Sequence, residues 1–238
     1  APASTATPGA TPAAPAAAAA PLAAAPASAP APTQLVTVTT DLVRATIAST
    51  GGTLVRLELL KQADALDSSK HVVLLDSSPS RLYLAETGLV PPAGGGGLPN
   101  HHTPMHFVPG DRSLPAGANE LKVVLESDPV GGVKLVKTYT FHRGDYVIDV
   151  EHRIENVSTA PVHPRLYLQL VRDGNDPPGG SSMYFTFTGP AIYTDSQHYR
   201  KVDFKSIEKR GPGDKPDHET SANNGWVAMV QHYFTSAW

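Results

Sequence analysis

The sequence contains no cysteine. This absence excludes disulfides, thiolate metal sites and cysteine nucleophiles, and it is compatible with an oxidising compartment. The sequence also has no uninterrupted apolar run of the roughly 18 residues that a membrane-spanning helix needs. Charged residues make up 17% of the chain and the formal net charge is −3, so there is no basic surface of the kind that nucleic acid requires. We therefore expect no nucleic-acid partner.

Residues 1–33 consist almost entirely of Ala, Pro, Thr and Ser. Their prolines recur too often for a stable helix, and such segments favour extended polyproline conformations. The segment also lacks the basic start and the leucine-rich centre of a signal peptide. We interpret residues 1–33 as a disordered Pro/Ala-rich linker and residues 34–238 as one globular domain. The alternative interpretation of the linker is a cloning artefact or a tolerated low-complexity tail.

The composition changes at Gln34 to short runs in which apolar and polar residues alternate with a period of two. Gly51 and Gly52 supply a turn that permits positive φ. Because no amphipathic helices separate these runs, the pattern predicts an all-β fold, a twisted antiparallel two-sheet sandwich, with minor helical segments near the C-terminus. The predicted strands are residues 35–39, 42–47, 53–60, 71–75, 81–85, 121–126, 133–141, 146–154 and 165–171.

Residues 225–238 are the most apolar and aromatic part of the chain. As a helix they would place Trp226, Met229 and Tyr233 on one stripe, whereas as two strands they would bury alternate residues on either side of a turn at residues 231–232. We favour two strands because the rest of the domain is β. These aromatic residues either fill the core or contact a partner, and the candidates are Gly225, Trp226, Met229, Tyr233, Phe234 and Trp238.

Signals for a metal or a cofactor are weak. His101, His102 and His106 lie in a Pro/Gly-rich loop and could in principle bind zinc or nickel, but such a loop rarely presents ligands rigidly. Residues 173–176 resemble part of a calcium loop and lack the closing bidentate glutamate. We therefore expect a polar turn there, and no metal or cofactor in this chain.

Signals for catalysis are equally weak. Ser206 and Lys209 have the Ser-x-x-Lys spacing of some acylating enzymes without the companion motifs, and residues 156–158 form a glycosylation sequon that is also typical of a turn. We expect His152, on the dry face of a strand, to be a hydrogen-bonded core residue. No pair of carboxylates can be placed in a cleft, and those considered are Glu120, Glu126, Asp149, Glu151 and Glu155.

Four groups of residues together resemble a known family. They are Thr50-Gly51-Gly52 followed by Leu59-Leu60-Lys61, Arg143-Gly144-Asp145-Tyr146 with Asn156, Gly189-Pro190-Ala191-Ile192-Tyr193, and Gly225-Trp226-Val227-Ala228-Met229 with Tyr233-Phe234 and Ala237-Trp238. From about residue 35 to residue 238 the chain resembles the large periplasmic domain of bacterial membrane protein insertases of the YidC family. The last group is the most specific of the four.

This resemblance implies a sandwich of the galactose mutarotase-like type, tethered on the periplasmic side of the bacterial inner membrane. It also implies that insertase activity resides in a membrane core outside this chain, and that Sec translocon components and nascent membrane proteins are the partners. The favoured hypothesis is a non-enzymatic accessory domain. The alternative is a carbohydrate-binding module or an aldose-epimerase-like enzyme, which would need convergent carboxylates or histidines in its cleft.

Overall fold

A computed structural model describes residues 32–175 and 186–238 of the chain. In this part of the chain the structure consists of strands joined by turns, with one short helix, so the predicted all-β fold is confirmed. All but two residues of the predicted linker lie outside the described residues. The elements are β1 (Leu35–Thr39), β2 (Val43–Ala48), β3 (Thr53–Ala63), β4 (His71–Ser78), β5 (Arg81–Val90), β6 (Met105–Phe107), β7 (Glu120–Ser127), β8 (Val133–His142), β9 (Ile148–Asn156), β10 (Arg165–Arg172), β11 (Gly189–Thr194), β12 (His198–Lys201), α1 (Phe204–Glu208), β13 (Gly225–Gln231) and β14 (Phe234–Ala237).

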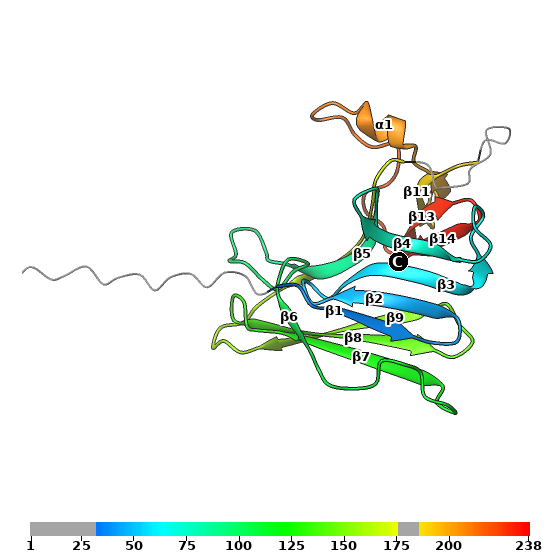
Figure 1. Cartoon of the computed structure of the whole chain (residues 1–238). Helices are drawn as coiled ribbons and strands as arrows, with labels where there is room; N and C mark the ends of the chain where they lie inside the picture. The colour runs from blue at the N-terminus through cyan, green and yellow to red at the C-terminus, as the bar shows by residue number, and fades with distance from the viewer. Residues whose placement is uncertain (1–31, 176–185) are drawn as a thin grey trace, which may run out of the picture. The chain divides into compact units, whose positions relative to one another are not determined.

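The strands form three antiparallel sheets. The largest sheet has the order β1-β2-β3-β4-β5-β10, and the two smaller sheets have the orders β6-β7-β8-β9 and β12-β11-β13-β14. Figure 1 shows β1 to β3 lying over β7 to β9, with β11, β13 and β14 close to β4 and β5. The domain is therefore a sandwich whose large sheet is covered by two smaller ones.

One face of β5 meets both small sheets. Side chains alternate across a strand, so Tyr83 and Thr87 point to the same side. The Tyr83 hydroxyl donates a hydrogen bond to the Met229 carbonyl of β13 over 3.4 Å, and Thr87 Oγ1 lies 2.7 Å from His152 Nε2 of β9. The two small sheets thus pack on the same face of the large sheet at different points along β5.

The core between the sheets follows the predicted period of two. In β8 the odd-numbered residues Val133, Leu135, Tyr139 and Phe141 are buried, whereas the even-numbered residues are less buried, apart from Val136. Each fully buried side chain of this size contributes roughly 1.5 to 3 kcal/mol of hydrophobic stabilisation. Lys137 occupies the remaining odd-numbered position and is also fully buried.

The closing segment forms β13 and β14 joined by a turn, which confirms strand, turn and strand over the helical alternative.

All nine predicted strands are present, and β3 to β5 run further than predicted. Strands β6, β11 and β12 were not predicted, because they are short and carry Gly, Pro or polar residues in place of a clear alternation. The helix α1 is capped by Asp203, whose side chain accepts a hydrogen bond from the Lys205 amide over 2.8 Å. None of the described residues belongs to a helix long and apolar enough to span a membrane.

Candidate functional site

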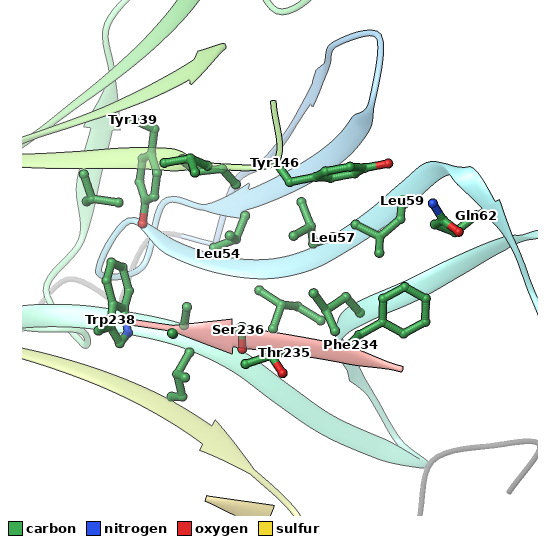
Figure 2. A pocket seen from close by; sticks show the side chains of 18 residues that line it. Leu54, Leu57, Leu59, Gln62, Tyr139, Tyr146, Phe234, Thr235, Ser236 and Trp238 are labelled. Carbon is green, nitrogen blue, oxygen red and sulfur yellow. The ribbon is translucent and has the colours of Figure 1, made fainter. Parts of the chain in front are cut away.

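A cleft of about 410 Å³ opens between the large sheet and β14. Figure 2 shows Leu54, Leu57 and Leu59 along β3, with Tyr139 and Tyr146 on one side of this strand and β14 on the other. Tyr146 is 44% exposed and Val147 is 57% exposed, so apolar surface of the lining reaches solvent. The lining residues are Leu54, Leu57, Leu59, Gln62, Leu74, Leu75, Ala85, Tyr139, Tyr146, Val147, Ile148, Val150, Leu170, Phe234, Thr235, Ser236, Ala237 and Trp238.

The chemistry of the cleft is apolar and neutral. None of the described residues that line it is a carboxylate or a histidine. One of its polar groups, the Tyr139 hydroxyl, is already engaged because it donates a 2.6 Å hydrogen bond to the Gly52 carbonyl. The burial of this phenol raises its pKa, so it stays protonated at neutral pH. The lining offers apolar contact and a few hydrogen bonds, without an acid and base pair for proton transfer.

Lys137 lies in the core beside this cleft without forming part of its lining. Its ammonium group donates hydrogen bonds to the carbonyl oxygens of Gly51, over 2.6 Å, and Thr87, over 3.3 Å. Burial lowers the pKa of Lys137 to about 7, and the negative charge of Glu86 opposes this change only in part. The sequence analysis missed this residue, although a lysine on the inward side of an alternating apolar strand is a visible signal.

His152 makes the hydrogen bond that its position on the strand predicts. Its Nε2 atom lies 2.7 Å from Thr87 Oγ1, and the ring is half-buried. Burial lowers the pKa of His152 to about 4, and the nearby positive charge of Lys137 contributes in the same direction. His152 is therefore a neutral structural residue at physiological pH.

A polar cluster lies on the opposite face of β5, because Glu86 alternates with Thr87. Glu86 accepts a hydrogen bond from the Gln169 side chain and lies 3.9 Å from His101 Nε2. The His101 ring contacts the Tyr167 hydroxyl, and burial raises the pKa of that phenol. Here a carboxylate, an imidazole and a phenol converge, which the sequence did not indicate because they come from distant segments.

The three loop histidines do not form a metal site. His101 packs against His102 with ring centroids 3.9 Å apart, whereas His106 lies 3.4 Å from the Asp128 carboxylate. Across residues 32–175 and 186–238, no three His, Asp or Glu side chains are grouped so that they could hold a metal ion.

The other weak signals of the sequence have structural explanations. Asn156 accepts hydrogen bonds from the Ser158 amide and hydroxyl, which confirms a turn. The Asn175 amide donates to Asp173, as in a polar turn, and Asp176 lies outside the described residues. The Ser206 hydroxyl donates to the Asp203 carbonyl at the start of α1. Most of the carboxylates considered pair with nearby basic side chains: Glu120 with Lys122, Glu126 with Lys134, Asp149 with His142 and Glu155 with Arg153.

The six candidate residues of the closing segment occupy different places. Phe234 and Trp238 line the cleft, and Met229 is buried in the core. Trp226 points to the other face of its sheet, because it lies three positions from Met229 on a strand that pairs with β11 without a register shift. The two remaining candidates are Gly225, where a Cβ atom would lie 2.2 Å from the Tyr193 carbonyl oxygen, and Tyr233, which is 81% exposed in the turn.

Trp226 belongs to a group of three aromatic side chains, Tyr193, Tyr199 and Trp226, which we call the aromatic face; Tyr193 is partly buried and the other two are exposed. Tyr193 pairs with both other residues across β11, so all three share one side of the sheet. The Tyr193 and Trp226 rings stack with centroids 5.8 Å apart and planes 12° apart, and the Tyr199 ring lies 5.9 Å from Trp226. Tyr199 is 46% exposed and Trp226 is 38% exposed. The aromatic face is a stacked, half-exposed surface of the kind that protein contacts use.

Comparison with known proteins places this structure in context. The family model described as the YidC periplasmic domain matches residues 35–238. A membrane protein insertase YidC of Janthinobacterium sp. (strain Marseille) is 50% identical over 204 residues, which is 86% of this chain and 34% of that protein. The proteins of the same name from Bordetella pertussis and Burkholderia thailandensis are 47% and 49% identical, over 85% and 86% of this chain. The chain thus spans about a third of the length of these relatives.

Proposed function

Because the chain belongs to the family of YidC periplasmic domains, we propose that it is a periplasmic accessory domain of a bacterial inner-membrane protein insertase. In this role it assists the insertion and folding of membrane proteins by contacting Sec translocon components or the emerging segments of nascent membrane proteins. The domain is tethered to the membrane in the full-length protein, and the insertion reaction belongs to the rest of that protein.

The observation that carries this proposal is the aromatic face. Trp and Tyr are enriched among the residues that dominate binding energy at protein interfaces, because they bury a large area at low entropic cost. Trp226 is held in place by its stack on Tyr193 and by the pairing of β13 with β11. A partner would therefore meet rings that are already ordered, so that less entropy is lost on binding.

We propose further that the domain is not an enzyme and needs no cofactor. The main support is the cleft, whose described lining has no carboxylate and no histidine. A galactose mutarotase-like sandwich that acted as an epimerase would need such groups within reach of a bound sugar.

The second candidate function, a carbohydrate-binding module or an aldose-epimerase-like enzyme, is favoured by one observation. Glu86, His101 and Tyr167 converge on the opposite face of β5, where they could contact a sugar. A glycan array combined with mutarotase assays tests this candidate. Specific binding or turnover that is lost in Glu86→Gln would show that an accessory role is an incomplete description.

Site-specific photo-crosslinking in the full-length protein tests the main proposal. A photoreactive amino acid replaces Tyr199 or Trp226 in turn, and an exposed position on β7, Lys122, serves as the control. Mass spectrometry then identifies the crosslinked proteins. We expect translocon components or nascent membrane proteins at the aromatic face and not at the control position. Equal crosslinking at all three positions would refute a specific contact.

A further inference from the structure

A second cavity, of about 240 Å³, lies beside the edge strand β12 and is lined by residues of β12, α1 and the loop after α1. None of its lining residues is shared with the cleft. Four of its eight lining residues are Lys or Arg and one, Asp217, is a carboxylate, so the cavity is enriched in positive charge. We call it the cationic pocket, and its basic residues are Arg200, Lys201, Arg210, Lys215 and His218.

Within the described residues, the one carboxylate of the cationic pocket is outnumbered by four Lys and Arg side chains. No ion pair in residues 32–175 and 186–238 involves Arg200, Lys201, Arg210 or Lys215. Lys201 Nζ lies 5.1 Å from the centroid of the Phe187 ring, a contact that leaves its charge in place. The chain as a whole has a formal net charge of −3, so this local excess of cations is opposite in sign to the net charge of the chain. Like charges around one cavity repel each other, and a bound anion would remove that repulsion.

The residue types indicate which anion suits the pocket. Two of the cations are arginines, whose planar guanidinium groups bind phosphate oxygens through paired hydrogen bonds. Tyr199 directly precedes Arg200 on β12, is half-exposed, and lies on the same side of the strand as Lys201. Tyrosine beside lysine and arginine is the combination found where proteins meet the headgroup region of a membrane. Lys and Arg side chains near an anionic lipid surface are attracted to it by about 1 kcal/mol each.

We propose that the cationic pocket binds the phosphodiester headgroup of an anionic phospholipid in the periplasmic leaflet of the inner membrane. Such a contact would fix the orientation of the domain at the membrane surface and hold the neighbouring aromatic face toward membrane-embedded partners. The inference rests on the proposed function in one respect, because it requires a domain that works beside a membrane.

Vesicle flotation with the 238-residue chain tests this inference. The vesicles contain phosphatidylglycerol mixed with phosphatidylcholine, or phosphatidylcholine alone. The test variant is Arg210→Gln with Lys215→Gln, and the control variant is Arg165→Gln with Lys61→Gln, which removes the same two charge types from exposed positions of the large sheet. A third arm adds soluble inorganic phosphate or glycerol 3-phosphate as a competitor, in order to separate a lipid headgroup from free phosphate.

We expect binding that requires phosphatidylglycerol and weakens as salt is raised. Each cation near an anionic surface strengthens binding about fivefold, so the test variant should bind about 25-fold more weakly, whereas the control variant changes less than about threefold. Absence of binding to phosphatidylglycerol vesicles, equal losses in the two variants, or full displacement by millimolar phosphate would each overturn the proposal. None of these results would affect protein crosslinks at the aromatic face, so the two proposals can fail separately.

Discussion

The buried Lys137 predicts how the stability of the domain depends on pH. In the unfolded chain its pKa is the ordinary 10.5, and in the folded domain burial lowers it to about 7. Between these two values the unfolded chain binds more protons than the folded domain does, so the free energy of unfolding rises with pH. The maximal slope is about 1.4 kcal/mol for each pH unit, which amounts to about 3 kcal/mol between pH 7 and pH 9.5.

The perturbation that isolates this effect is Lys137→Met, which keeps the volume of the side chain and removes its charge. The substitution leaves the Gly51 and Thr87 carbonyls without their donor, at a cost of about 1 to 3 kcal/mol that does not change with pH. The absolute stability of the variant is therefore less informative than its slope. Because burial raises the pKa of Tyr83 and Tyr139, the stability should fall again above about pH 10, and the measurement should stop below that value.

Urea unfolding followed by tryptophan fluorescence at several pH values between 7 and 9.5 measures both slopes. We expect the free energy of unfolding of the natural sequence to rise over this range and that of Lys137→Met to stay nearly flat. Lys122→Met, at an exposed position, should keep the slope of the natural sequence. Parallel slopes for the natural sequence and Lys137→Met would show that Lys137 does not titrate as its burial requires.

Three further predictions concern single residues. In Lys137→Met the pKa of His152 should rise from about 4 and remain below 6.5, because the nearby positive charge is lost while burial remains. An NMR titration of His152 measures this change. In the natural sequence the low pKa of His152 makes the free energy of unfolding fall as pH drops from 6.5 to 4. Gly51→Ala should lower the free energy of unfolding in urea by at least about 2 kcal/mol more than Gly117→Ala does. Both residues have positive φ, but a Cβ atom at Gly51 would lie 2.2 Å from the His101 carbonyl oxygen, whereas one at Gly117 would meet nothing within 4 Å. Equal losses would contradict the close approach of His101 to this turn. Trp226→Ala should cost about 1 to 2 kcal/mol, less than the 3 to 5 kcal/mol of a fully buried tryptophan, because its ring is 38% exposed, and thermal unfolding checks this.

The period-two alternation was sufficient to predict nine strands, because burial of one sheet face imposes that pattern locally. The two-strand form of residues 225–238 was favoured by the β context of the rest of the domain and not by the local pattern. It was not sufficient to predict the aromatic face. Tyr193 and Tyr199 are joined by a tight turn, but their approach to Trp226 depends on β13 pairing with β11, which no local pattern encodes. The same limit applies to the cleft, since its walls come from β3 and from β14 near the other end of the chain.

Lys137 illustrates a different limit. Its position among Val133, Leu135, Tyr139 and Phe141 was readable as inward, but its partners were not. The carbonyl groups that receive its ammonium belong to a turn and a strand of another sheet, and any residue type can supply a carbonyl. The positions of backbone carbonyl acceptors therefore cannot be predicted from the residue types in the sequence.

The Gly51-Gly52 turn also bears on how the domain reaches its folded state. The Gly51 carbonyl accepts from Lys137 and the Gly52 carbonyl from Tyr139, and these partners lie 86 and 87 positions apart along the chain. Contacts of such long range form late and slowly, so folding on the millisecond to second scale is expected for this topology. A slip of one residue between the sheets would leave an ammonium group in an apolar layer without any acceptor. The tip of the β2–β3 hairpin therefore favours the native alignment of the large sheet with the β6-β7-β8-β9 sheet, because that alignment places the two carbonyls beside Lys137 and Tyr139.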